Sequence, residues 1–193
     1  MTRIIAGKAG GIRLRVPPKG TRPTTDRVRE ALFSLLASRL DFDGERVLDL
    51  YAGSGALGLE ALSRGADTAV FVESDARALA VVKDNVRTAR LHGADVVRSD
   101  VAAFVGKPAR QTYTLVLADP PYTVGEPAVR TVLERLVQHG WLADHALVVV
   151  ERSARSPETT WPTSFSGVDS RRYGETRIDI AEYLPRVPSR DGD

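Results

Sequence analysis

From residue 46 onward, short apolar runs alternate with segments whose apolar residues recur at helical spacing. Strands connected through helices pair in parallel, with helices on both faces of the sheet. Two later runs have no helix between them and predict an antiparallel hairpin at the sheet edge. The sequence therefore predicts an α/β, Rossmann-like fold with a mostly parallel seven-stranded sheet and an antiparallel last strand. The expected strands are 47–52, 68–72, 94–98, 114–118, 146–150, 167–172 and 176–183.

The two ends of the chain differ from this alternating body. Residues 3–20 hold two β-prone runs around a glycine-rich turn, which predicts a hairpin, and a helical apolar face follows to about Leu40. We expect a basic N-terminal hairpin and helix over 1–40. A main domain over 41–184 and a flexible tail over 185–193 complete the chain.

Basic residues are concentrated in the N-terminal segment. Residues 1–39 carry nine Lys and Arg against two acidic residues, a net charge of +7, whereas the remainder carries −5. A basic arm on a mildly acidic body favours a polyanionic partner, although charge alone does not separate RNA from DNA or a membrane surface. The plain alternative is that these charges only solvate one face of the hairpin. We favour a nucleic acid as the partner. The expected phosphate contacts are Arg13, Arg15 and Lys19.

Composition excludes several classes of protein. The 193 residues contain no cysteine, which excludes disulfides and thiolate zinc sites, and the three histidines are too scattered to suggest a metal centre. No apolar stretch is long enough to span a bilayer, and the start lacks the apolar core of a signal peptide. We expect a cytoplasmic protein with no membrane partner, and a monomer because no long apolar stripe is left over.

Residues 49–58 read Asp-Leu-Tyr-Ala-Gly-Ser-Gly-Ala-Leu-Gly, a G-x-G-x-x-G loop between a strand and a helix. Nicotinamide, flavin and other nucleotide sites share this pattern. Asp49 would repel a pyrophosphate and suits an amine-bearing cation, while Glu73, at the end of the second strand, can accept from ribose hydroxyls. The two acids together fit S-adenosylmethionine. The expected cofactor-binding residues are Asp49, Tyr51, Gly53, Ser54, Gly55 and Glu73.

Asp100 follows the third expected strand. Its carboxylate could accept from an adenine amine, which adds it to the expected cofactor site. A helix N-cap for residues 101–105 is nearly as good an explanation.

The strand expected at 114–118 ends in Asp119-Pro120-Pro121-Tyr122. This end brings together a carboxylate, a neighbouring carbonyl, a turn stiffened by two prolines and an aromatic face. An exocyclic NH2 can donate to Asp119 and to the Pro120 carbonyl while its ring stacks on Tyr122. A merely rigid turn is the alternative. The glycine loop upstream favours a catalytic role for Asp119, Pro120 and Tyr122.

At this point the chain resembles the class I S-adenosylmethionine-dependent methyltransferases, and within them the RsmD family of bacterial ribosomal RNA guanine-N2 methyltransferases. Nearly the whole chain carries the resemblance. Its motifs are Arg3-Ile-Ile-Ala-Gly with Gly11, the box Arg22-Pro-Thr-Thr-Asp-Arg-Val-Arg-Glu-Ala-Leu-Phe33, Leu48-Asp-Leu-Tyr-Ala-Gly-Ser-Gly55, Glu73, and Asp119-Pro-Pro-Tyr122. The Asp119-Pro-Pro-Tyr122 tetrad alone would fit any amino-group methyltransferase. The box at 22–33 narrows the resemblance to the RsmD family.

The resemblance implies a target guanine in small-subunit (16S) ribosomal RNA, met as free RNA or within an assembled or assembling 30S particle. It also implies that the box contributes to the cleft, so Thr25 is a candidate for the cofactor and Arg27 for the substrate. We accordingly expect the segment over 1–40 to act as an RNA contact and a cleft lid. Tyr173, with arginines near it, is a further candidate RNA contact at the cleft rim. A sheet-edge hairpin protected by charge explains Tyr173 and its neighbours equally well.

Other functions fit less well. A DNA adenine-N6 methyltransferase would need a target-recognition domain, for which the chain has no spare length. A protein-glutamine methyltransferase would carry Asn at position 119, and a dinucleotide oxidoreductase would leave the tetrad unexplained. A non-catalytic RNA-binding module would not need Asp49, Glu73 and Asp119 all intact.

Overall fold

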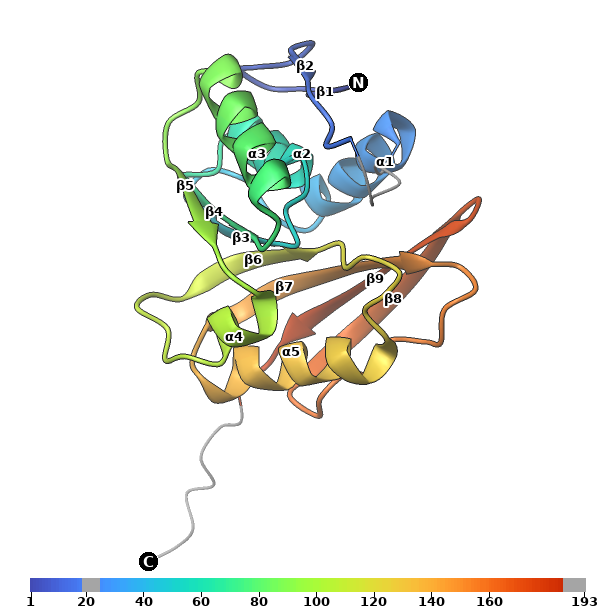
Figure 1. The fold of residues 1–193 in the computed structure, drawn as a ribbon. Coiled ribbons are helices and arrows are strands. Elements are labelled where there is room, and N and C mark those ends of the chain that lie inside the picture. The colour runs from blue at the N-terminus through green and yellow to red at the C-terminus, as the bar shows by residue number, and fades with distance from the viewer. Residues whose placement is uncertain (19–24, 186–193) are drawn as a thin grey trace, which may run out of the picture.

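A seven-stranded sheet forms the middle layer of the protein, in the order β5-β4-β3-β6-β7-β9-β8 (Figure 1). The computed structural model describes residues 1–18 and 25–185. The pairs from β5 to β7 are parallel, and β9 is antiparallel to both β7 and β8. The strands are β3 (Arg46–Leu50), β4 (Thr68–Glu73), β5 (Ala94–Arg98), β6 (Tyr113–Ala118), β7 (Leu142–Ser153), β8 (Phe165–Tyr173) and β9 (Thr176–Tyr183).

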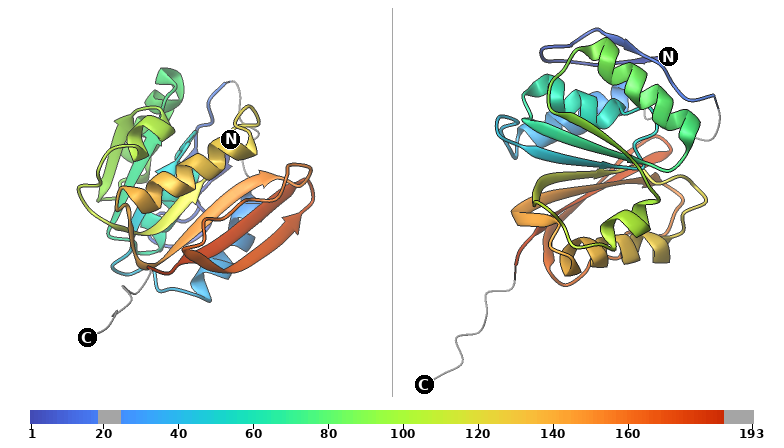
Figure 2. Two further views of the ribbon diagram at one scale, coloured as in Figure 1. Left: turned by 90° about the horizontal axis from the view of Figure 1, so that it is seen from below. Right: turned by 60° about the vertical axis from the view of Figure 1, so that its left-hand side comes forward.

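Helices cover both faces of the sheet, as the turned views show (Figure 2). The helices α1 (Asp26–Ala37), α2 (Ala56–Arg64) and α3 (Ala76–Ala89) supply one buried cluster with the sheet. The helices α4 (Val101–Val105) and α5 (Glu126–Gln138) supply the other. The fold class expected from the alternating pattern is confirmed.

The pleat of β3 decides which way the site residues point. Successive side chains of a strand face opposite sides. Val47 packs in the cluster of α1, α2 and α3, whereas Leu48 and Leu50 pack in the cluster of α4 and α5. Asp49 therefore lies on the α2 side of the sheet, beside the helix that the glycine loop opens.

Two two-residue strands, β1 (Thr2–Arg3) and β2 (Arg13–Leu14), form the expected N-terminal hairpin. Leu14 is buried and its neighbours Arg13 and Arg15 are exposed, so this part of the hairpin has an apolar and a cationic face. Lys19, the start of the box at 22–24 and the tail at 186–193 lie outside the described residues.

Several boundaries differ from the sequence expectations. Strand β3 ends at Leu50 instead of residue 52, and β4, β6 and β8 differ by one or two residues at an end. Helix α1 ends at Ala37 instead of near Leu40. Strand β7 spans Leu142–Ser153 instead of 146–150, because its last residues pair with Thr176–Ile178 of β9. Those last residues are Glu-Arg-Ser and carry no apolar signal. Among the helices of residues 1–18 and 25–185, none is both long and apolar enough to cross a bilayer.

Candidate active site

Three acidic residues lie at the carboxyl ends of neighbouring strands. Asp49 is in β3, Glu73 ends β4, and Asp119 follows β6 directly. Because these strands are parallel neighbours, their carboxyl ends share one edge of the sheet. The Asp119 N–H donates to the Leu50 carbonyl at 3.4 Å, so the Asp119-Pro-Pro-Tyr122 turn starts beside the glycine loop.

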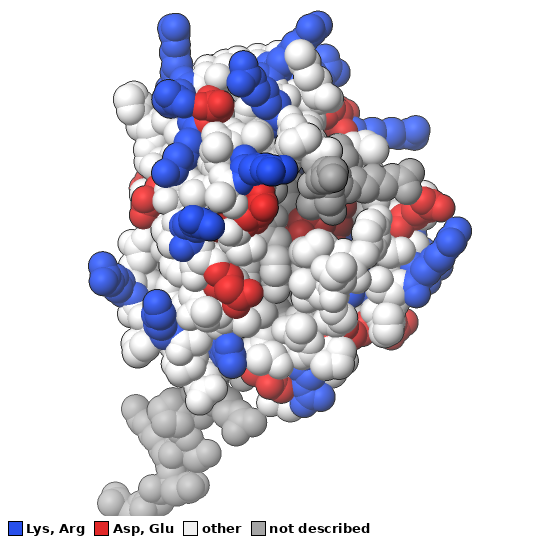
Figure 3. Space-filling view, in the orientation of Figure 1, with Lys and Arg blue, Asp and Glu red and all other residues white. Residues whose placement is uncertain are grey.

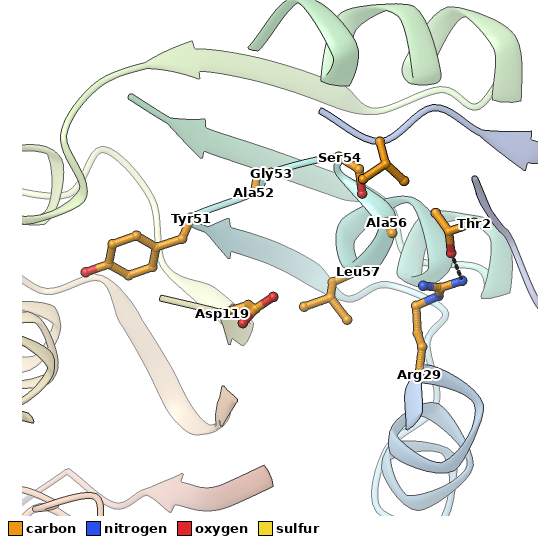
Figure 4. A pocket seen from close by; sticks show the side chains of 10 residues that line it. Thr2, Arg29, Tyr51, Ala52, Gly53, Ser54, Ala56, Leu57 and Asp119 are labelled. Atoms are coloured by element: carbon orange, nitrogen blue, oxygen red, sulfur yellow. Dashed lines mark hydrogen bonds between the residues drawn. The ribbon is translucent and has the colours of Figure 1, made fainter. Parts of the chain in front are cut away.

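Asp119 and the glycine loop line one pocket (Figure 4). The close-up shows the Asp119 carboxylate facing Leu57, and Arg29 reaching from α1 toward Thr2. The pocket combines the glycine loop, the start of α2, the N-terminal hairpin, α1 and the turn that starts at Asp119. Its lining residues are Thr2, Val16, Arg29, Tyr51, Ala52, Gly53, Ser54, Ala56, Leu57 and Asp119.

The glycine loop has the backbone that its sequence predicts. Gly53 and Gly55 have φ of 57° and 77°, in the left-handed region where glycine carries no side-chain penalty. The Gly53 N–H donates to Glu73 Oε2 at 2.9 Å, and the Asp75 N–H donates to Glu73 Oε1 at 2.8 Å. Glu73 thereby fixes the loop, and each of its oxygens keeps a further lone pair for a ligand.

Asp49 is a buried acid with 1% of its surface exposed. Its Oδ2 accepts from the Gly58 N–H at 2.9 Å. Burial raises the pKa of Asp49 to about 8, the Gly58 hydrogen bond opposes this rise, and the charge of Glu73 adds to it. A Cβ at Gly58 would lie 2.4 Å from Phe71 Cε1 and 3.0 Å from Asp49 Oδ2, so glycine is required for this contact.

Asp100 lies at the same sheet edge, beyond β5. Its Oδ1 accepts from the Ala103 N–H at 2.9 Å, which confirms the helix N-cap that the sequence suggested. Tyr51 lies within electrostatic reach of Asp100. Burial raises the pKa of Tyr51 to about 12, the charge of Asp100 adds to the rise, and Arg152 opposes it. Arg152 was not singled out from the sequence, because a single arginine in a strand carries no signal.

The Asp119-Pro-Pro-Tyr122 turn follows β6 directly. Pro120 is buried, and Tyr122 is 67% exposed. The turn closes through the Val124 N–H, which donates to the Pro121 carbonyl at 2.9 Å. Within the described residues no hydrogen bond uses the Pro120 carbonyl.

The described part of the box at 22–33 also has a structural role. Thr25 is the N-cap of α1, accepting from the Val28 N–H at 3.3 Å. Arg29, 1% exposed, donates to Thr2 Oγ1 at 3.0 Å and to Asp26 Oδ1 at 2.9 Å, and its Nε lies 3.8 Å from Glu60 Oε2. The sequence analysis missed Arg29 and Glu60. A charged residue among buried helix residues was the available signal of a buried ion pair. Glu60 is such a residue, because its neighbours in α2 are buried.

The expected RNA contacts are spread over the surface. Arg13, Arg15 and Arg27 are exposed. Tyr173 is half-buried and packs against the core cluster of α1, α2 and α3. In the space-filling view, Lys and Arg gather over the upper part of the molecule, where β2 and α3 lie in Figure 1 (Figure 3).

Comparison with known proteins matches residues 2–182 to the family described as Conserved hypothetical protein 95. Ribosomal RNA small subunit methyltransferase D of Escherichia coli K12 is 41% identical over 165 residues, covering 85% of this chain and 81% of that protein. The protein of the same name from Haemophilus influenzae is 36% identical over 164 residues, covering 82% of each.

Solved structures agree with this assignment. The structure of a hypothetical protein of Thermus thermophilus matches with a TM-score of 0.77 and 34% identity, covering 94% of this chain and 99% of that one. The residues matched by the family model include every motif quoted above. The chain therefore belongs to the Conserved hypothetical protein 95 family, the RsmD-type methyltransferases that the sequence resemblance identified.

Proposed function

We propose that this protein transfers a methyl group from S-adenosylmethionine to the exocyclic N2 of a guanine in small-subunit ribosomal RNA. One observation carries the proposal: Asp119 lines the same pocket as residues 51–54 of the glycine loop. An amine acceptor and a cofactor loop thus meet in one space. The names of the relatives support ribosomal RNA as the substrate.

The residues of the glycine loop and the two acids beside it fit S-adenosylmethionine. Asp49 and Glu73 flank the loop with carboxylates, which suit an ammonium and ribose hydroxyls and oppose a pyrophosphate. A ligand ammonium near Asp49 would offset the burial that raises its pKa. We assign Tyr51, Gly53, Ser54 and Gly55 to the same site, with Asp100 and Thr25 at its margin. When bound, S-adenosylmethionine supplies an electrophilic methyl group, and transfer forms the N2–C bond as the S–C bond breaks.

The catalytic turn holds the substrate base. Asp119 and the Pro120 carbonyl accept the two N2 hydrogens, and Tyr122 stacks on the ring. This grip turns the N2 lone pair away from conjugation with the ring. Positive charge develops on N2 during transfer, and the Asp119 carboxylate stabilises it and is the nearest acceptor for the proton that N2 loses. A base held this way has left its stack.

The N-terminal hairpin and α1, over 1–40, form the basic arm of the proposed RNA interface, and the body over 41–184 holds the reaction. Arg13, Arg15 and Arg27 bind phosphates in this proposal, with Lys19 and Tyr173 as further contacts. The small body leaves little surface for reading sequence, so we propose an assembled or assembling 30S particle as the substrate and a monomer as the active form.

Transfer of labelled methyl from S-adenosylmethionine tests the proposal. The acceptors are small ribosomal subunits from cells that lack this protein, deproteinised ribosomal RNA and duplex DNA, each followed by nucleoside analysis. We expect N2-methylguanosine from the subunits. Methyladenine from DNA would overturn the assigned substrate.

The Asp119→Ala variant tests the assigned chemistry. We expect turnover to fall by about 100-fold or more while cofactor affinity changes little, because Asp119 acts on the amine. Glu134→Ala, an exposed change on α5, is the matched control. Turnover near the wild-type value in Asp119→Ala would remove Asp119 from the mechanism.

A further inference from the structure

Asn85 joins the basic hairpin to the glycine loop. Its side chain lies on the buried face of α3 and is 1% exposed. The Nδ2 group donates to the Arg15 carbonyl at 2.9 Å and to the Ser54 carbonyl at 2.8 Å, and Oδ1 accepts from the Arg15 N–H at 2.8 Å. Both amide hydrogens and the amide oxygen are used, so Asn85 is a fully satisfied buried bridge.

The bridge holds Arg15 as a neighbouring strand would. One amide group accepts from the Arg15 N–H and donates to the Arg15 carbonyl, although β2 itself ends at Leu14. The preceding helix residue also contacts Arg15, since Arg15 Nη1 lies 3.6 Å from Asp84 Oδ2. The Arg15 side chain is 76% exposed. Helix α3 thus fixes the backbone of a residue whose head group is presented to solvent.

The other end of the bridge is at the cofactor pocket. Ser54, whose carbonyl accepts from Asn85, lines that pocket, and so does Val16, the residue after Arg15. The hairpin and the loop therefore meet at the pocket wall through a single side chain from a third element. A displacement of the Ser54 carbonyl would disturb the same amide that orders Arg15.

We infer that Asn85 is a positioning residue that couples cofactor binding to RNA binding, so that each ligand strengthens the binding of the other. This inference rests on the proposed function, with the cofactor at the glycine loop and RNA phosphate at Arg15. A ligand that holds residues 53–55 in place also fixes the Asn85 amide, which lowers the entropy that Arg15 must lose when RNA binds. Thermodynamic linkage makes the effect equal in both directions.

The coupling is measured as a ratio of two dissociation constants. Small ribosomal subunits from cells lacking this protein are titrated with and without saturating S-adenosylhomocysteine, which cannot donate a methyl group. We expect the wild type to bind the subunits at least about fivefold more tightly with S-adenosylhomocysteine present. In Asn85→Ala the ratio is expected to fall to about one, with both ligands still binding.

Two further variants separate coupling from general weakening of α3. Asn85→Asp keeps the size and the acceptor for the Arg15 N–H but loses both donors, so we expect it to lose the coupling as well. Ala89→Gly, at a buried position of the same helix, loosens α3 without touching Arg15 or Ser54 and is expected to retain the wild-type ratio. Coupling kept in folded Asn85→Asp, or lost in Ala89→Gly, would overturn the inference.

The wild-type measurement also tests the inference without any variant. If the wild type binds both ligands with a ratio of one, the inference is wrong and the proposed function stands. If the wild type binds neither S-adenosylhomocysteine nor the subunits, the proposed function fails and takes the inference with it.

Discussion

The Gly58 N–H donates to Asp49 Oδ2 at 2.9 Å, and the two residues lie at opposite ends of the glycine loop. This bond ties the end of β3 to the first turn of α2 and so fixes the width of the cofactor loop. It also leaves a carboxyl almost fully buried at the base of the proposed site. The protonation of Asp49 therefore depends on whether the chain is folded and whether a ligand is bound.

The stability of the protein should decline from about pH 4 to about pH 8. Burial holds the pKa of Asp49 at about 8 in the folded state, against 3.8 ordinarily. The folded state therefore retains a proton that the unfolded chain loses within this window, and the free energy of unfolding falls as pH rises. The loss approaches about 1.4 kcal/mol for each pH unit. Urea denaturation at pH 5, 6, 7 and 8 measures it.

Asp49→Asn provides the comparison. Asparagine keeps an acceptor for the Gly58 N–H and has no proton to lose in this window, so the stability of the variant should depend less on pH. Asp144→Asn, which removes an exposed carboxylate, should keep the wild-type slope. Parallel pH profiles for wild type and Asp49→Asn would contradict the assignment.

The sequence predicted those parts of the site that follow from where a strand ends. Glu73 and Asp119 were expected because each stands where an apolar run ends, and Asp49 because it lies inside a strand end just ahead of the glycine loop. Parallel pairing brings these strand ends to one edge. Glu60 and Asn85 were missed. Each lies among buried helix residues, and its partners in the hairpin and the glycine loop are 31 to 70 residues away in the chain. Local patterns cannot identify such partners, because only the packing of the hairpin on α2 and α3 brings them together.

Removal of Glu60 should be costly. Its side chain is fully buried, accepts from the Ile5 and Ala6 N–H groups at 2.7 and 3.1 Å, and pairs with Arg64 Nε at 2.8 Å. Glu60→Ala would leave the buried Arg29 with less compensating charge, and we expect a loss of about 3–5 kcal/mol in the free energy of unfolding.

Chemical denaturation measures this loss, and an exposed pair is the control. Arg130 Nε lies 2.8 Å from Glu134 Oε1, with both side chains about half exposed. Glu134→Ala should change the free energy of unfolding by less than about 1 kcal/mol. A similar small change for Glu60→Ala would mean that the buried network contributes little to the stability of the hairpin.

Tyr122 should affect the substrate and leave the fold unchanged. Its ring is 67% exposed, so Tyr122→Ala removes little packing. Stacking of a base on an aromatic ring is worth about 1–3 kcal/mol, so kcat/KM for ribosomal RNA should fall about 5- to 150-fold. Tyr122→Phe keeps the ring and should stay near the wild type. Equal losses in both variants would indicate that the hydroxyl, and not stacking, matters.

The arginines of the N-terminal hairpin should set the salt dependence of RNA binding. Arg13 and Arg15 are exposed on its cationic face. Each phosphate contact contributes about 0.7–0.9 to the slope of log K against log salt, so the double change to alanine should lower the slope by about 1.4–1.8. Arg130→Ala, on α5 at the opposite face of the sheet, should leave it unchanged. An unaltered slope in the double variant would place the RNA elsewhere on the surface.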